Sequence, residues 1–210
     1  MLLRTATALA LGLAAASAAA ATLDPGAWTI GPVIRGQSHS RLMPLHPSSG
    51  PGRGFQIALP QAPGSLHYVT FRHGSLAGKS RIVMRYRIEA APGVQIVPRT
   101  APRLPSQITL YFQRSGDNWS GRGPFEAYRW YATFSTQSPV TPGSHELVAP
   151  LNGNWTAVGS SSARLNPAAF RAALAEADQV GFVLGGGDGY GHGVFATGPA
   201  RLVVTKFTIE

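Results

Sequence analysis

Alternation of apolar and polar residues is the dominant pattern in this chain of 210 residues. In segment 80–89, SRIVMRYRIE, the even positions from Ile82 to Ile88 are apolar, while three arginines and a glutamate occupy most of the odd positions. A two-residue period is typical of a β-strand with one buried face. The same pattern predicts further strands at 28–34, 55–59, 67–73, 107–114, 126–134, 145–150, 155–158, 179–184 and 200–210.

Segments rich in glycine and proline separate these strands, among them 47–54 (PSSGPGRG), 141–144 (TPGS) and 185–193 (GGGDGYGHG). Glycine and proline favour tight turns because of their special backbone dihedral angles. Many short strands joined by such turns indicate an all-β fold, as an antiparallel β-sandwich or barrel. We predict the sandwich.

One segment has helical spacing instead. Asn166 is a good N-cap residue, and Pro167 suits the first helical position. The following PAAFRAALAEA is rich in helix-forming residues and places Phe170 and Ala173 on one face. The sequence therefore predicts a short helix over 167–177 that caps one end of the sandwich.

The first 21 residues have the layout of a secretory signal peptide. A single early positive charge at Arg4 precedes an apolar run, and small residues follow up to Ala21. This layout predicts export to the periplasm or the extracellular space, and the alanine-rich leader and the arginine-heavy composition are typical of bacteria. Residues 22–210 are then expected to form a single domain, with no transmembrane segment after cleavage.

The amino-acid composition limits the kinds of functional site that the chain can form. The chain has no cysteine, which excludes disulfides and thiolate chemistry. It has 18 Lys plus Arg against 9 Asp plus Glu, a formal net charge of +9. These basic residues form no continuous run, so we expect no nucleic-acid partner. Two interpretations stay open: attraction to anionic surfaces, or arginines spread over solvated strand faces.

The order of elements resembles a known superfamily. Many strands, a short helix, a strand at 180–184, a glycine-rich loop and a closing strand ending in RLVVTKFTIE resemble the galactose-binding-like jelly-roll superfamily, which includes many carbohydrate-binding modules. The segments LYFQRSGDNWSG, YRWY and GGGDGYGHG also resemble those of a family of secreted bacterial proteins, which implies no activity. The resemblance implies a jelly-roll sandwich that binds a glycan or cell-surface polysaccharide. A structural Ca²⁺ is common in such modules, but no carboxylate cluster here supports one.

The first candidate site follows the strand at 107–114. Its polar, glycine-flanked loop presents Asp117, Asn118 and Trp119, with Arg114 and Tyr128 as supports. Sugar faces stack on aromatic rings, and sugar hydroxyls need short polar side chains. The alternative for Tyr128 is a core position.

The second candidate lies in the loop 185–193, where Asp188, Tyr190 and His192 alternate with glycine. We expect these side chains to face outward and to complete the sugar site, provided that the two loops lie together. A wide turn without function is the alternative. A phosphate-binding loop is excluded because a strand follows instead of a helix.

The leading hypothesis is therefore a secreted, non-catalytic carbohydrate-binding protein with no cofactor and no metal site. One alternative is a cell-envelope or extracellular assembly protein, whose oligomeric state the sequence does not give. The other is a carbohydrate-active enzyme, which needs a carboxylate pair such as Asp117 and Glu126. The scarcity of carboxylates and the absence of histidine pairs with metal-binding spacing disfavour catalysis.

Overall fold

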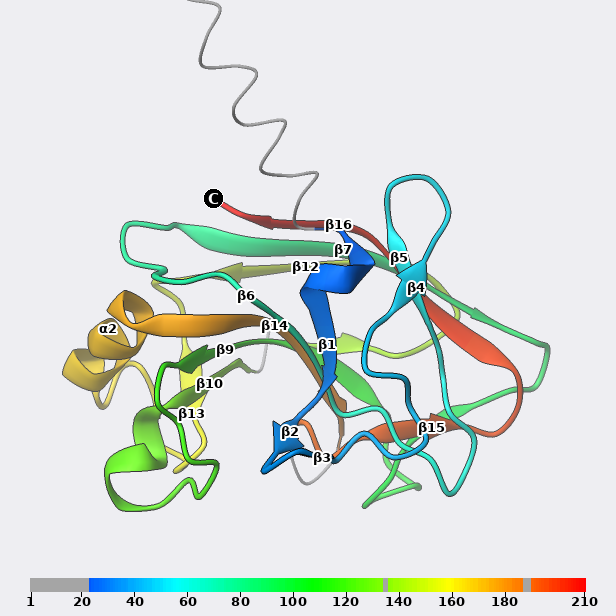
Figure 1. Ribbon diagram of the computed structural model, residues 1–210, viewed down its shortest axis with the longest axis horizontal. Helices are drawn as coiled ribbons and strands as arrows, with labels where there is room; N and C mark the ends of the chain where they lie inside the picture. The colour runs from blue at the N-terminus through cyan, green and yellow to red at the C-terminus, as the bar shows by residue number, and fades with distance from the viewer. Residues whose placement is uncertain (1–22, 134–135, 187–189) are drawn as a thin grey trace, which may run out of the picture.

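Two antiparallel β-sheets pack face to face in the computed structural model, which describes residues 23–133, 136–186 and 190–210 (Figure 1). The larger sheet has the order β1 (Trp28–Gly31), β6 (Tyr68–Arg72), β14 (Ala177–Gly185), β9 (Gln107–Arg114), β10 (Arg129–Ala132) and β13 (Trp155–Ala157), and β11 (Ser138–Pro139) also pairs with β9. The smaller sheet has the order β12 (Gly143–Pro150), β7 (Arg81–Ala90), β16 (Ala200–Ile209), β5 (Phe55–Ala58) and β4 (Ser48–Ser49). The predicted all-β sandwich is confirmed.

Two small strand pairs and two 3₁₀ helices complete the described fold. The pairs are β2 (Val33–Ile34) with β3 (Gln37–Ser38), and β8 (Ile96–Pro98) with β15 (Val194–Ala196). The 3₁₀ helices are η1 (Pro25–Ala27) and η2 (Gly123–Ala127). In Figure 1 the β2–β3 pair and η2 both lie on the side of the larger sheet that faces away from the smaller one.

The core lies between the two sheets and is built by the inward faces of their strands. Trp28 of β1 is fully buried, with ring centroids 4.8 Å from Phe55 and 5.0 Å from Phe207 of the opposite sheet. In β7 the apolar positions from Ile82 to Ile88 are buried as their alternation predicts. Removing these large side chains from water is the main driving force for such a fold.

The predicted helix is present as α2 (Pro167–Ala175), at the left end of the sandwich in Figure 1. Asn166 Oδ1 accepts a hydrogen bond from the amide of Ala169, which is the capping interaction expected from the sequence. Phe170 anchors the helix to the larger sheet, with its ring 4.8 Å from Trp130 and 5.9 Å from Phe112. The helix ends two residues earlier than predicted, because Ala177 already pairs with Arg114 in the sheet.

The predicted strand at 126–134 is partly wrong. Glu126 lies in η2, and Tyr128 follows η2 in a helical conformation, so β10 begins only at Arg129. The segment starts with Gly123 and a proline that cannot donate to a strand ladder, and these residues favour the 3₁₀ turn. Within β10 the alternation holds, because Trp130 faces the core and its neighbours face outward.

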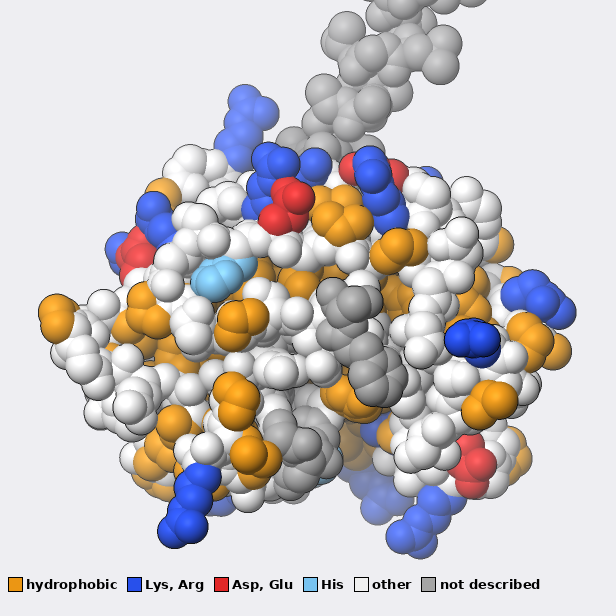
Figure 2. All heavy atoms as spheres, turned by 180° about the vertical axis from the view of Figure 1, so that it is seen from behind, with side chains coloured by type: hydrophobic (Ala, Val, Ile, Leu, Met, Phe, Trp, Pro, Cys, Tyr) orange, Lys and Arg blue, Asp and Glu red, His pale blue; other side chains and the backbone are white. Residues whose placement is uncertain are grey.

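The arginines of β7 lie on the outer, solvated face of the smaller sheet. Arg85 pairs with Glu146, and Glu89 pairs with both Arg87 and Arg201. In the view of Figure 2, Lys and Arg side chains lie in separate groups, several of them beside acidic ones. Within the described part of the chain, no helix is both long enough and apolar enough to cross a membrane.

Candidate functional site

A second aromatic cluster lies on the outer face of the larger sheet. It consists of Tyr68, Tyr111, Tyr131 and Val183, one from each of four neighbouring strands, and we call it the outer cluster. The Tyr68 and Tyr131 hydroxyls are 2.9 Å apart, and the Tyr111 ring lies 5.1 Å and 5.2 Å from theirs. Each member is at most 6 % exposed, although a sheet face outside a sandwich is normally solvated. Other segments of the chain must therefore shield the outer face of the larger sheet from solvent.

Two loops cover the outer cluster, and they are the two that the sequence singles out. Trp119, from the loop after β9, packs edge-on against Tyr68 at 5.5 Å. Tyr190, from the segment after β14, stacks on Tyr131 at 5.1 Å with 28° between the rings. Strands β9 and β14 are antiparallel, so these loops start at opposite ends of the sheet, and Trp119 and Tyr190 both contact the outer cluster. The loops therefore lie together, as the sugar-site hypothesis requires.

A buried ion pair holds the Trp119 loop in place. The Asp117 side chain is 0 % exposed and its Oδ2 lies 3.0 Å from Nε of Arg129, whose side chain is 9 % exposed. Asp117 Oδ1 accepts a hydrogen bond from the amide of Trp119, and Oδ2 accepts one from Gln113. Asp117 is thus a support for the loop, and its carboxylate does not face solvent.

Arg129 completes the support from the other side. Its Nη2 donates a hydrogen bond of 3.1 Å to the carbonyl of Trp119, and its guanidinium carbon lies 4.9 Å from the indole centroid. Its Nε faces Asp117 as an ion pair without hydrogen-bond alignment. Burial raises the pKa of Asp117, and the Arg129 charge opposes that shift. Trp119 has a φ of 64°, a left-handed conformation that is unfavourable for a bulky side chain and that these contacts maintain.

A cavity of about 630 Å³ opens between the two loops, and we call it the main cavity. Its aromatic floor consists of Tyr68, Trp119, Tyr131 and Tyr190. Polar residues surround this floor: His39, His67, Arg129, Asn154, Thr156, Ser160, Ser162 and His192. Ser160, like Trp119, has a positive φ, of 65°. Strained backbone at two lining positions is typical of functional sites.

Several polar groups of the main cavity have no protein partner. Within the described residues, five lining side chains make no side-chain hydrogen bond: His39, Asn154, Ser160, Tyr190 and His192. All but Tyr190, which is half-buried, are exposed, so water satisfies them in the free protein. They are therefore available to a polar ligand.

His67 anchors the second loop. Its Nδ1 lies 2.9 Å from the carbonyl of Gly191, so Nδ1 carries the proton, and Nε2 accepts a hydrogen bond of 3.0 Å from the Ser65 hydroxyl. Burial lowers the pKa of His67 to about 4, and the nearby positive charges of Arg99 and two histidines act in the same direction. At neutral pH His67 is an uncharged structural link.

The remaining candidates lie elsewhere. Arg114 and Tyr128 stack on each other at 4.7 Å, and Arg114 pairs with Glu176, but neither lines the main cavity. Asn118 also lies outside the cavity lining, and its Oδ1 accepts a hydrogen bond from the Ser120 amide. Asp188 lies outside the described residues.

Sequence reasoning missed much of the lining. Arg129 and Tyr131 came from a predicted strand, and their outward orientation was visible only as alternation with the core residue Trp130. His67 is two residues from the core residue Val69, so alternation would have placed it inward, and in the structure it precedes β6. Asn154 and Ser160 flank the short strand β13, and no sugar-binding pattern in the sequence marks either of them. A signal that could have found Arg129 and Tyr131 is the motif YRWY itself, whose polar positions alternate with a core tryptophan.

None of the described residues that line the main cavity is Asp or Glu, and among the described residues no three His, Asp or Glu side chains are placed to hold a metal ion. Comparison of the chain with models of known protein families gives no match, and neither does comparison with curated proteins.

Proposed function

We propose that the protein is a non-catalytic carbohydrate-binding module, exported as its leader suggests, and that the main cavity is its glycan site. The observation that carries this proposal is the aromatic floor of the main cavity together with four exposed polar side chains that make no side-chain hydrogen bond among the described residues, namely His39, Asn154, Ser160 and His192. A volume of about 630 Å³ is within the usual range for small-molecule sites.

The combination of aromatic rings and polar side chains in the main cavity suits a pyranose sugar. One face of a pyranose ring is made of C–H groups, which pack on an aromatic ring, while its hydroxyls both donate and accept hydrogen bonds. Tyr190 has one face against Tyr131, and histidine, asparagine and serine side chains line the same cavity. Affinity would come from stacking, and specificity from the hydroxyl contacts.

Hydrolysis fits the site less well. Glycosidases need two carboxylates on either side of the scissile bond. Asp117 is fully buried against Arg129, and Glu126 accepts a hydrogen bond from the Gly123 amide within its own turn. Neither lines the main cavity, so this predicted pair has no access to a sugar there.

The test is a glycan array followed by calorimetry with the best ligand. Tyr190→Ala removes a stacking ring and should weaken binding about tenfold, and His192→Ala should weaken it severalfold. Trp119→Ala should abolish binding, with thermal unfolding recorded because Trp119 also packs on the outer cluster.

Tyr128→Ala is the matched control, since Tyr128 is a partly exposed aromatic residue outside the cavity lining. It should leave affinity unchanged. Absence of binding to every glycan, or equal affinities of the wild type and of folded Tyr190→Ala and Trp119→Ala proteins, would overturn the proposal.

A further inference from the structure

A second hollow adjoins the main cavity on the other side of Trp119. It has a volume of about 400 Å³ and lies over the outer faces of β1, β6 and β14, so we call it the side cavity. The two cavities share three lining residues, Pro32, Tyr68 and Trp119. The two cavities therefore meet at a boundary that includes Trp119.

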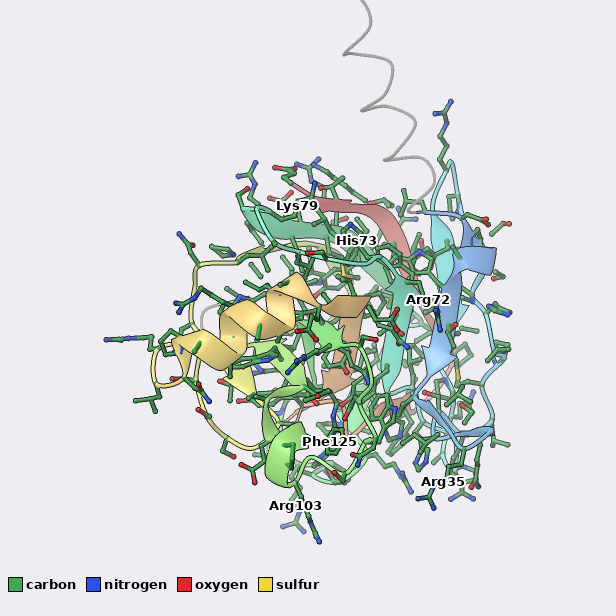
Figure 3. The ribbon with its side chains drawn as sticks, turned by 60° about the vertical axis from the view of Figure 1, so that its left-hand side comes forward. Arg35, Arg72, His73, Lys79, Arg103 and Phe125 are labelled. Carbon is green, nitrogen blue, oxygen red and sulfur yellow. The ribbon has the colours of Figure 1, made fainter. Side chains whose placement is uncertain are left out.

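The side cavity also has the polar groups that a sugar needs. Thr70 donates a hydrogen bond of 3.0 Å to Oε1 of Gln179, which leaves the Gln179 amide nitrogen without a partner among the described residues. Arg72 lies opposite Gln179 in the sheet, and its side chain is 85 % exposed and forms a long ion pair of 3.9 Å with Asp178. In Figure 3 the Arg72 side chain lies beside β1. The Gln179 amide nitrogen and the exposed Arg72 guanidinium, whose ion pair with Asp178 is long, are therefore accessible to a ligand.

From this arrangement we infer that the site takes a glycan chain, which runs across Trp119 and occupies both cavities, rather than a single terminal sugar. The inference rests on the proposed function. Trp119 is the shared wall of two binding positions, so its ring contacts two consecutive sugars or the linkage between them.

The support beneath Trp119 fits this role. A residue that borders two binding positions must keep its orientation when either is occupied. The Asp117–Arg129 pair fixes the backbone of Trp119 on both its amide and its carbonyl sides, and Tyr68 contacts the indole edge-on. A rigid aromatic partition costs little conformational entropy on binding.

The test uses defined oligosaccharides of one to six units from cello-, chito-, xylo-, galacto- and uronic-acid series, with affinity measured by calorimetry. For the series that binds, affinity should rise at least tenfold between the shortest ligand bound and the tetrasaccharide, because the second cavity adds contacts without a second loss of translational freedom.

Variants separate the two cavities. Gln179→Ala and Arg72→Ala should each weaken binding of the tetrasaccharide three- to tenfold and leave the monosaccharide or disaccharide unchanged, whereas His192→Ala should weaken all lengths. Gln61→Ala is the matched control, since Gln61 is exposed and lines neither cavity. Because Gln179 accepts a hydrogen bond from buried Thr70, thermal unfolding of the Gln179→Ala protein is recorded to confirm that it is folded. Arg72→Ala removes only an exposed side chain, so it tests the side cavity without this risk to stability.

The outcomes are distinguishable. A length-independent affinity, or equal loss for short and long ligands in both side-cavity variants, overturns the chain-binding inference and leaves a single-sugar site in the main cavity. No binding at any length in any series overturns the proposed function together with the inference.

Discussion

Among single residues, His67 combines a structural and an electrostatic role. Its imidazole is 8 % exposed and is held between Ser65 and Gly191 in the neutral form. A proton on Nε2 would destroy its role as acceptor for the Ser65 hydroxyl and place a charge in a poorly solvated position. Protonation therefore opposes the folded state and loosens the segment that carries Tyr190.

This gives a pH dependence with a defined sign. The pKa of His67 is about 4 when folded and about 6.5 when unfolded, so the unfolded chain binds the extra proton between these values. The stabilisation is complete above pH 6.5 and should decline as the pH falls towards 4, by at most about 1.4 kcal/mol per unit and about 3 kcal/mol in total. Urea denaturation at a series of pH values measures this slope.

His67→Asn is the informative variant, because its side-chain amide can still donate to Gly191 without titrating. The variant should lose the slope between pH 4 and 6.5, while His192→Asn, at an exposed position, should retain it. An unchanged slope in His67→Asn would show that other groups control the acid response.

The Asp117–Arg129 pair gives a second prediction at this scale. Asp117→Asn leaves a buried guanidinium without its counter-charge, which typically costs about 3–5 kcal/mol of unfolding free energy. Glu146→Gln removes an exposed partner of Arg85 and should change stability little, because water and salt screen surface pairs. Chemical denaturation compares the two, and similar small losses would contradict the buried role of the pair.

Among elements, the turn after β13 stores local strain beside the main cavity. Ser160 closes this turn through a hydrogen bond from its amide to the carbonyl of Ala157, with a φ of 65°. Glycine accepts this conformation without a steric cost, so Ser160→Gly should raise the unfolding free energy by about 0.5–1 kcal/mol. The neighbouring Ser161 has no positive φ, so Ser161→Gly should lower it. Denaturant titration of the two variants measures both changes in unfolding free energy. Destabilisation by Ser160→Gly would contradict the inference that Ser160 is strained in the folded state.

The elements themselves were largely predictable from local signals. The strand at 107–114 and the Asn166 cap follow directly from alternation and capping chemistry, which depend only on neighbouring residues. The error at 126–134 arose because an aromatic-rich run masked the turn that begins at Gly123. Local patterns identify a strand well, but they fix its first residue poorly.

At the scale of the whole molecule, the site depends on contacts that no local pattern contains. Trp119 and Tyr190 are brought together because β9 and β14 are paired and because each loop folds back over the outer cluster. Both Trp119 and Tyr190 are among the candidates that sequence analysis identifies. The inward orientation of Asp117 is not predictable in the same way, because its ion-pair partner Arg129 has the pattern of a solvent-exposed strand residue. Arg114 and Tyr128 have the right chemistry for a sugar and lie outside the cavity lining.

The position of β16 affects how the protein must be made. This strand lies in the middle of the smaller sheet, between β7 and β5, although it comes from residues 200–209. More than a hundred residues separate the end of β7 from β16, so β5 and β7 are synthesised before the strand that pairs with both of them exists. A chain interrupted before residue 200 would leave two unpaired strand edges, which invite aggregation.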